Sequence, residues 1–197
     1  MVKKKINIAI FISGKGSNLN SIIKYFKKNL KIKISLVISN NLNAYGLTYA
    51  KKSRIKRKFV NYKNKLKAEN LILALLRTNE IQIVCLAGFM KILSRNFIKK
   101  FNKPILNIHP SLLPKYKGLD THKRVIEAKE KFSGCTVHVV TPALDSGKII
   151  AQKKIRIKKN DTPITLGKRI LKYEHLIYPK TIKKFVSNLW KKIGFHS

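Results

Sequence analysis

Short apolar runs alternate with amphipathic segments through the first half of the chain. Residues 6–12 read Ile-Asn-Ile-Ala-Ile-Phe-Ile, a run rich in β-branched side chains that is typical of a buried strand. In 66–76 the apolar residues recur at helical spacing, and Leu66, Leu73 and Leu76 are expected on the inner face. This alternation indicates a parallel, doubly wound sheet. We predict strands at 6–12, 33–39, 58–60, 81–86 and up to 109, helices at 19–28 and 66–76, and a helix that begins within 43–50.

The pattern changes in the second half of the chain. A helix is predicted at 121–128, followed by two strands at 134–140 and 148–157. Because a short turn around Asp145 joins these two strands, we expect them to form an antiparallel continuation of the sheet.

A long helix is predicted at the end of the chain. It begins at Asp161-Thr162-Pro163, where Asp or Thr caps and Pro occupies the first turn. Pro179 is expected to break or kink this helix, which then resumes to about Trp190. No linker or repeat divides residues 1–197. We therefore predict a single α/β domain, doubly wound and Rossmann-like, whose mostly parallel sheet has an antiparallel C-terminal part and a long C-terminal helix.

The net charge is extreme for a chain of otherwise ordinary globular composition. The 197 residues carry 44 Lys and Arg against 8 Asp and Glu, a formal charge of +36, while 44% of residues are hydrophobic. The basic residues are spread along the whole chain, and no zinc-finger, RGG-like or RRM-type signature accompanies them. We interpret most of the charge as solvated surface that also steers anionic substrates. No specific nucleic-acid partner is expected, although RNA could bind weakly at low salt.

The two cysteines and the N-terminal residues indicate the compartment. Cys85 and Cys135 each lie in an apolar run, and no CxxC or other metal-ligand spacing is present. Two buried thiols fit a reducing cytoplasm, so we expect neither a disulfide framework nor a metal. Residues 1–5 are basic, but the apolar run that follows is too short for a signal peptide, and no stretch approaches the length of a membrane span. We expect a cytoplasmic protein with no membrane partner.

A glycine-containing loop at 13–18 connects the first predicted strand to the first predicted helix. Its residues, Ser-Gly-Lys-Gly-Ser-Asn, place backbone N–H groups at a helix start, which is a phosphate-binding arrangement. Leu19 stands where a dinucleotide fingerprint needs its third glycine, and Gly16 interrupts the Gly-Lys-Ser order of a P-loop. We interpret the loop as a small phosphate cradle with Ser17 and Asn18 as polar contacts and helix caps. A tight turn with an ordinary N-cap is the open alternative.

A polar pair stands where another apolar run ends. Asn107 and His109 share one face of a predicted strand, and Pro110 prevents that strand from continuing as a paired one. Ligands of doubly wound sheets bind at the carboxyl ends of the strands, so the glycine loop, the turn at 88–93 and this strand end should lie at one edge. On spacing alone, a catalytic pair and a hydrogen-bonded core histidine beside a turn asparagine both remain open.

The sequence around this pair resembles a known active-site signature. Residues 107–114 read Asn-Ile-His-Pro-Ser-Leu-Leu-Pro, and 144–147 read Leu-Asp-Ser-Gly; together they are similar to the signature of the folate-dependent formyltransferases. The resemblance implies an enzyme that transfers a formyl group from 10-formyltetrahydrofolate as co-substrate. It also implies that Asn107, His109 and Asp145 are catalytic and that no metal or tightly bound cofactor is required.

Further motifs favour one branch of that family. The residues at 13–18, 43–47, 86–93, 114–118 and 173–175 resemble the purine-synthesis branch, whose acceptor is 5-phosphoribosylglycinamide. The methionyl-tRNA formyltransferases share the signature but carry a further C-terminal domain for tRNA, which we do not expect in a chain that ends at Ser197. The alternatives are such a tRNA formyltransferase catalytic domain and a basic RNA-binding protein. A monomer or weak homodimer is expected.

The resemblance also implies which residues bind the two substrates. Acceptor-binding residues would be Gly16, Ser17, Asn18, Leu171, Lys172, Tyr173 and Glu174, with Glu174 facing the reacting amine. Folate-binding residues would be Lys65, Met90, Lys91, Ile92, Leu93, Asn107, Thr141, Pro142, Ala143, Leu144 and Asp145. Lys65 and Lys91 stand where the family has an arginine, and lysine keeps the charge but loses the bidentate fork.

The chemistry of formyl transfer requires side chains of these types. Attack by the acceptor amine on the formyl carbon produces an oxyanion, to which Asn107 and a protonated His109 can donate hydrogen bonds. His109 and a water held by Asp145 could relay a proton from the attacking nitrogen to the departing one. His138 either supports this pocket or is a neutral histidine bonded to backbone, while His122 and His196 are expected on the surface.

Overall fold

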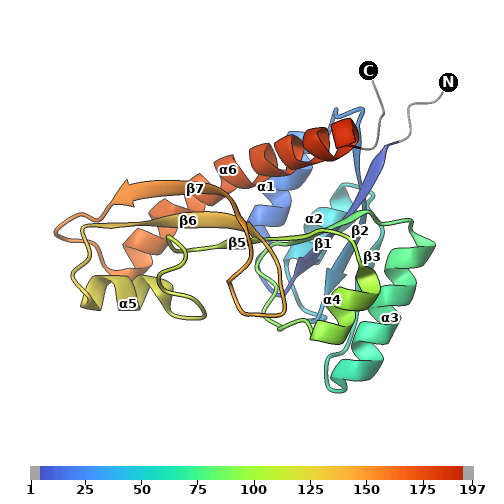
Figure 1. The fold of residues 1–197 in the computed structure, drawn as a ribbon, viewed down its shortest axis with the longest axis horizontal. Coiled ribbons are helices and arrows are strands. Elements are labelled where there is room, and N and C mark those ends of the chain that lie inside the picture. The colour runs from blue at the N-terminus through green and yellow to red at the C-terminus, as the bar shows by residue number, and fades with distance from the viewer. Residues whose placement is uncertain (1–4, 193–197) are drawn as a thin grey trace.

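Seven strands form one mixed sheet in the order β3-β2-β1-β4-β5-β6-β7 in the computed structural model, which describes residues 5–192 (Figure 1). Neighbouring strands from β3 to β5 pair in parallel, whereas β6 is antiparallel to both β5 and β7. This arrangement confirms the predicted fold class. The strands are β1 (Ile6–Ile12), β2 (Ile32–Ser39), β3 (Arg57–Phe59), β4 (Ile83–Leu86), β5 (Ile105–His109), β6 (Phe132–Val139) and β7 (Ile149–Arg156).

Helices cover both faces of the sheet, so the inner strands are apolar on both sides. On β1, Ile8 and Ile10 enter one core, whereas Ala9 and Phe11 enter the other. The first core is closed by α1 (Ser17–Phe26), α2 (Gly46–Lys52) and α6 (Pro163–Lys192), and the second by α3 (Lys65–Thr78) and α4 (Arg95–Phe101). A third, smaller core lies where α5 (Thr121–Glu127) and the first turns of α6 meet β6 and β7.

Helix α6 runs without interruption through Pro179, so the expectation of a break there is wrong. Proline removes one helical hydrogen bond, but the surrounding packing outweighs that loss. Tyr178, Ile182 and Val186 of α6 are all buried in the first core. The Tyr178 hydroxyl also donates to the carbonyls of Leu86 and Leu106, at 2.9 and 3.0 Å, and thereby connects α6 to the last residue of β4 and the second residue of β5.

Two smaller expectations also fail, and one helix is absent from the predicted elements. Leu66 is 62% exposed, because the buried stripe of α3 begins only at Ala68. Helix α4 was not expected, although Ser94 caps it by accepting from the Phe97 N–H and the phenylalanines at 97 and 101 bury one face. His122 is half-buried rather than on the surface, and burial lowers its pKa. His196 lies outside the described residues.

The buried state of the cysteines agrees with the sequence analysis. Cys85 and Cys135 are free thiols with no exposed surface, and burial raises the pKa of each to about 12. Both thiols are therefore protonated and unreactive at neutral pH. Among residues 5–192, none of the helices combines the length and the apolar composition that a bilayer crossing needs.

The order of the strands reverses between β1 and β4, which creates a switch point at their carboxyl ends. The loops that follow these two strands are in contact there. The Ser13 N–H donates to the Gly88 carbonyl at 3.0 Å, and the Met90 N–H donates to the Ser13 hydroxyl at 2.7 Å. The glycine loop and the turn at 88–93 thus lie side by side, as the topology predicts.

Candidate active site

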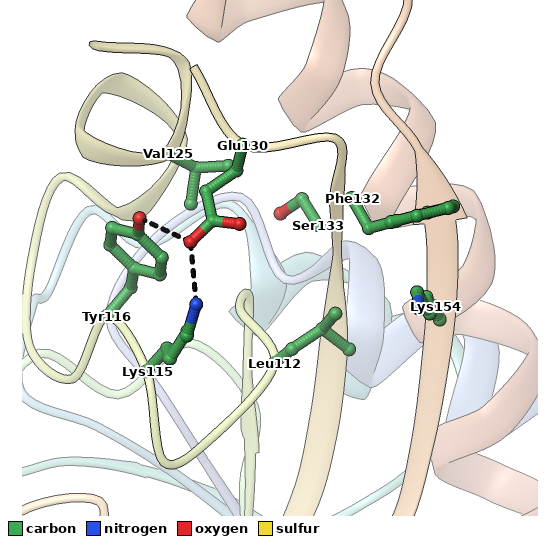
Figure 2. A pocket seen from close by; sticks show the side chains of 8 residues that line it. All are labelled: Leu112, Lys115, Tyr116, Val125, Glu130, Phe132, Ser133 and Lys154. Carbon is green, nitrogen blue, oxygen red and sulfur yellow. Dashed lines mark hydrogen bonds and ion pairs between the residues drawn. The ribbon is translucent and has the colours of Figure 1, made fainter. Parts of the chain in front are cut away.

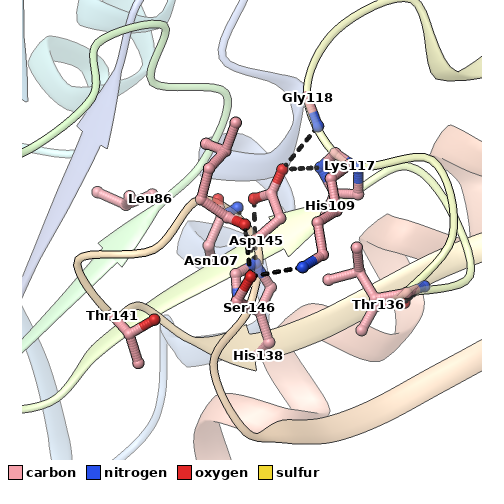
Figure 3. Close-up of polar contacts among 12 residues, drawn as sticks. Leu86, Asn107, His109, Lys117, Gly118, Thr136, His138, Thr141, Asp145 and Ser146 are labelled. Carbon is pink, nitrogen blue, oxygen red and sulfur yellow. Dashed lines mark hydrogen bonds and ion pairs between the residues drawn. The ribbon is translucent and has the colours of Figure 1, made fainter.

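Three polar side chains from two separate segments meet at the carboxyl end of β5. Asn107 and His109 come from the strand itself, and Asp145 comes from the loop between β6 and β7 (Figure 3). Oδ2 of Asp145 lies 3.3 Å from Nδ1 of His109. Both side chains are less than a tenth exposed, so their interaction is only weakly screened by solvent. The structure therefore brings together the three residues that the resemblance implies are catalytic.

The backbone around Asp145 directs its carboxylate toward His109. Asp145 has a φ of 46°, in the left-handed region that Asp and Asn tolerate better than most residues. Its Oδ2 also accepts a hydrogen bond from the Gly118 N–H at 2.9 Å. Gly118 ends the proline-containing loop that follows β5, so one carboxylate oxygen connects that loop to the loop between β6 and β7.

Both ring nitrogens of His109 face acceptors. Nε2 lies 2.8 Å from the Tyr116 carbonyl, which can only accept, so this nitrogen must carry a hydrogen. Nδ1 faces the Asp145 carboxylate, which also accepts when it is ionised. Only the doubly protonated ring donates to both partners. The Asp145 carboxylate thus faces Nδ1 of His109 while the Tyr116 carbonyl engages Nε2, and these two contacts fix the orientation of the ring.

His138 holds the amide of Asn107 and is neutral. The two residues are directly opposite each other in the β5–β6 ladder. Nδ1 of His138 lies 3.0 Å from the Val139 carbonyl, so Nδ1 carries the hydrogen and Nε2 accepts from Nδ2 of Asn107 at 3.1 Å. Desolvation by burial lowers the pKa of His138, which keeps the ring neutral. No other residue in the described part of the chain engages the second hydrogen of the Asn107 amide.

Nε2 of His138 lies 3.6 Å from Oδ1 of Asp145, but the two side chains do not form an ion pair while the His138 ring is neutral. In the neutral tautomer both atoms are acceptors, so they cannot share a hydrogen bond. Both interpretations of His138 therefore apply: the ring is neutral and bonded to backbone, and it also orients Asn107. Strand register alone places His138 opposite Asn107, and the sequence pattern did not reveal this contact.

The glycine loop turns tightly because two glycines touch. Gly16 has a φ of 71° and forms the N-cap of α1 without any side-chain capping bond. A Cβ on Gly16 would lie 2.5 Å from the Cα of Gly46, so no larger residue fits. The expected side-chain caps from Ser17 and Asn18 are absent at this N-terminus, because Ser17 is already in the helix and Asn18 points elsewhere.

Asn18 and Glu174 form a buried pair between α1 and α6. Nδ2 of Asn18 donates to Oε2 of Glu174 at 2.6 Å, and both residues are less than a tenth exposed. Burial raises the pKa of Glu174, an effect that the hydrogen bond from Asn18 partly offsets. Glu174 is thus not an ordinary acid on the surface of a helix. Its position beside the glycine loop is what a role in acceptor binding would require.

The other residues of 171–174 differ in their surroundings, because four consecutive helical residues point in different directions. Tyr173 packs toward β7, where the ammonium of Lys153 lies 5.4 Å from its ring centre. Lys172 is exposed to solvent and Leu171 is half-buried.

The residues implied in folate binding differ in their exposure to solvent. Met90, Ile92 and Leu144 are large apolar side chains with exposed fractions of 64%, 63% and 50%. Leu93, by contrast, is buried in the second core. The remaining members of this set are exposed or half-buried: Lys65, Lys91, Thr141, Pro142 and Ala143.

Two backbone groups of the site could not be recognised from the sequence. The Tyr116 carbonyl contacts His109, and the Gly118 N–H contacts Asp145 (Figure 3). Both groups belong to the loop after β5. Their directions depend on positive φ angles, 56° at Tyr116 and 77° at Gly118. Of these two residues, only the glycine indicates a positive φ from its residue type. Within residues 5–192, no group of three or more His, Cys, Asp or Glu side chains is arranged to hold a metal ion.

The chain resembles known proteins over nearly its whole length. Residues 6–182 match the formyl transferase family. A phosphoribosylglycinamide formyltransferase of Haemophilus influenzae is 42% identical over 182 residues, which cover 90% of this chain and 86% of that protein. A crystal structure of the phosphoribosylglycinamide formyltransferase of Anaplasma phagocytophilum has a TM-score of 0.89 at 39% identity, covering 94% of this chain and 88% of that one.

Some relatives are much longer. The human trifunctional purine biosynthetic protein adenosine-3 is 41% identical over 189 residues, which cover 94% of this chain but only 19% of that protein. The chain therefore spans about a fifth of the length of such relatives. The family match and the similarities to relatives of comparable length extend over the same seven-stranded fold and its strand-end site. This chain belongs to the formyl transferase family.

Proposed function

We propose that the protein transfers the formyl group of 10-formyltetrahydrofolate to the amine of 5-phosphoribosylglycinamide, and that the chain is a single domain for this reaction. The observation that carries the proposal is the meeting of Asn107, His109 and Asp145 at the sheet edge that also holds the glycine loop. A formyl-transfer centre and a phosphate cradle side by side suit an acceptor that has an amine at one end and a phosphate at the other.

In the proposed mechanism, Asn107 and His109 act on the oxygen of the formyl group. The acceptor amine forms a bond to the formyl carbon, and the carbonyl electron pair moves onto oxygen. The free N–H of Asn107 donates to this oxyanion, and the imidazolium of His109 stabilises it through its charge. Because both N–H groups of His109 are engaged, direct donation by His109 would require its release from Tyr116 or Asp145.

The collapse of the intermediate requires a proton transfer. The bond from the formyl carbon to the folate nitrogen breaks, and that nitrogen needs the proton that the attacking amine loses. Asp145 is placed to hold a water for this relay through Oδ1, since its Oδ2 is engaged with His109 and Gly118.

Substrate binding is proposed on both sides of this centre. The N–H groups at the start of α1 would bind the phosphate, with Glu174 toward the remainder of the acceptor. The exposed apolar side chains of Met90, Ile92 and Leu144 would cover the folate ring system.

Replacement of Ser17 by alanine is expected to raise the KM for the acceptor by roughly tenfold, because a hydrogen bond to a charged phosphate is lost. The KM for the folate should stay within about twofold. Steady-state kinetics with each substrate varied in turn measures both. Ser187→Ala, on the exposed side of α6, is the matched control. Equal changes in the two KM values would contradict the phosphate cradle. Asn18 is less suitable for this test, because its removal leaves Glu174 buried without a partner.

The acceptor itself is tested by competition between two substrates. Purified protein should formylate 5-phosphoribosylglycinamide in the presence of 10-formyltetrahydrofolate and leave charged initiator tRNA unchanged. Formylation of the tRNA alone would overturn the proposal in favour of the tRNA formyltransferase alternative.

The charge of +36 leaves RNA binding as the second candidate function. Diffuse surface lysines release counterions when they bind phosphates, so the affinity falls steeply with salt and carries little sequence preference. Binding of a labelled RNA should therefore be lost by about 150 mM salt in a fluorescence anisotropy titration. Sequence-specific binding that survives this salt concentration would favour the RNA-binding alternative.

We further propose a cytoplasmic location, which the two free, buried cysteines support, and a monomer or weak homodimer.

A further inference from the structure

The catalytic histidine depends on a carbonyl whose direction is not set by regular structure. Nε2 of His109 donates to the Tyr116 carbonyl, which also accepts from the Ser111 hydroxyl at 3.2 Å. Tyr116 is a non-glycine residue with a φ of 56°, a conformation that persists only where the surroundings hold it. The orientation of His109 therefore depends on the contacts that hold Tyr116 in this conformation.

Those contacts come from α5 and from the turn that follows it. Oε1 of Glu130 accepts from the Tyr116 hydroxyl at 3.0 Å and from the Lys115 ammonium at 2.9 Å (Figure 2). The guanidinium of Arg124 lies 5.5 Å from the centre of the Tyr116 ring and donates to the Lys117 carbonyl at 2.6 Å. Glu130 itself is fixed to α5, because its N–H donates to the Val125 carbonyl.

Glu130 is the acceptor on which two consecutive residues of the loop converge. Lys115 and Tyr116 each reach it with a side-chain donor, which closes the loop onto the α5–β6 connection. Both hydrogen bonds lower the pKa of Glu130, in agreement with an ionised acceptor. Acidic side chains are scarce in this chain, 8 against 44 basic ones, so no surplus of acids stands ready to replace it.

We propose that Glu130 is a positioning residue for catalysis: by holding Tyr116 and Lys115 it directs the Tyr116 carbonyl at His109 and so keeps Nδ1 of His109 on Asp145. Glu130 does not touch the reacting atoms and acts only through the loop. The kinetic part of this inference rests on the proposed formyl transfer, whereas the contact from Glu130 to His109 can be tested without it.

Three variants test the kinetic part. Glu130→Ala removes the shared acceptor and should lower kcat about tenfold or more, because small displacements of a catalytic group cost rate. The KM of both substrates should stay within about twofold, since no substrate contact is lost. Glu130→Gln keeps an oxygen acceptor for both donors and should restore most of kcat. Glu127→Ala removes an exposed acid of α5 whose only partner among the described residues is Lys123 at 3.8 Å, and it should leave kcat unchanged.

The spectroscopic part reads His109 directly. In protein labelled with ¹⁵N-histidine, the Nε2–H of His109 should give a protected proton signal, assigned by its loss in His109→Asn. We expect the signal to persist in Glu130→Gln and Glu127→Ala and to be lost in Glu130→Ala. A persistent signal together with normal or increased kcat in Glu130→Ala would overturn the inference. If neither the parent protein nor any variant formylates the acceptor, the proposed function is wrong. The spectra then still decide whether Glu130 positions His109.

Discussion

Asp145→Asn is expected to lower kcat by about 100-fold or more while the protein remains folded. The variant keeps the size of the side chain and an oxygen that can accept from the Gly118 N–H, and asparagine tolerates the φ of 46° as well as aspartate does. What it loses is the negative charge 3.3 Å from His109. Without that charge, a protonated His109 loses its negative partner, while its Nε2–H is donated to the neutral Tyr116 carbonyl.

The measurement is kcat for formyl transfer, together with thermal unfolding to confirm the fold. The KM for the acceptor should change little, since Asp145 is assigned to the chemical step rather than to the phosphate. Asp120→Asn is a matched control: Asp120 is also at positive φ, 54°, but it is exposed and makes no capping bond at the start of α5. A near-normal kcat in Asp145→Asn would reduce Asp145 to an ordinary turn residue.

The regular part of the fold could be predicted because its physical causes are local. The apolar run at 6–12 corresponds to β1 residue for residue, and a strand that stops before Pro110 had to place Asn107 and His109 on one face. The convergence of strand ends follows from parallel pairing alone. Leu66 and Pro179 mark the limit of such reasoning, because burial of a given position depends on how far a helix extends over the sheet and on what packs against it.

The contacts that complete the site depend on long-range geometry. His138 orients Asn107 only because β6 pairs with β5 in one particular register. Glu174 is buried only because α6 crosses α1 at Asn18, 156 residues earlier in the chain. A carbonyl such as that of Tyr116 is common to every residue type, so no sequence pattern distinguishes the one that meets His109. Asp145 was predicted to be catalytic from the resemblance alone, because no spacing rule connects His109 to a residue so far along the chain.

Replacement of Asn107 by alanine is expected to reduce kcat by about 10²- to 10³-fold, the usual cost of removing one oxyanion donor. Asn107 has a free N–H because its other hydrogen is donated to His138, which fixes the amide plane before substrate arrives. Asn107→Asp separates shape from chemistry: it keeps the size of the side chain but replaces the donor with a carboxylate, and it should lose as much activity as alanine does. Single-turnover rates would measure both, with Asn96→Ala on the exposed surface of α4 as control. If Asn107→Asp retained normal rates, the oxyanion donor would have to be sought elsewhere, and the engaged N–H groups of His109 would be the first place to look.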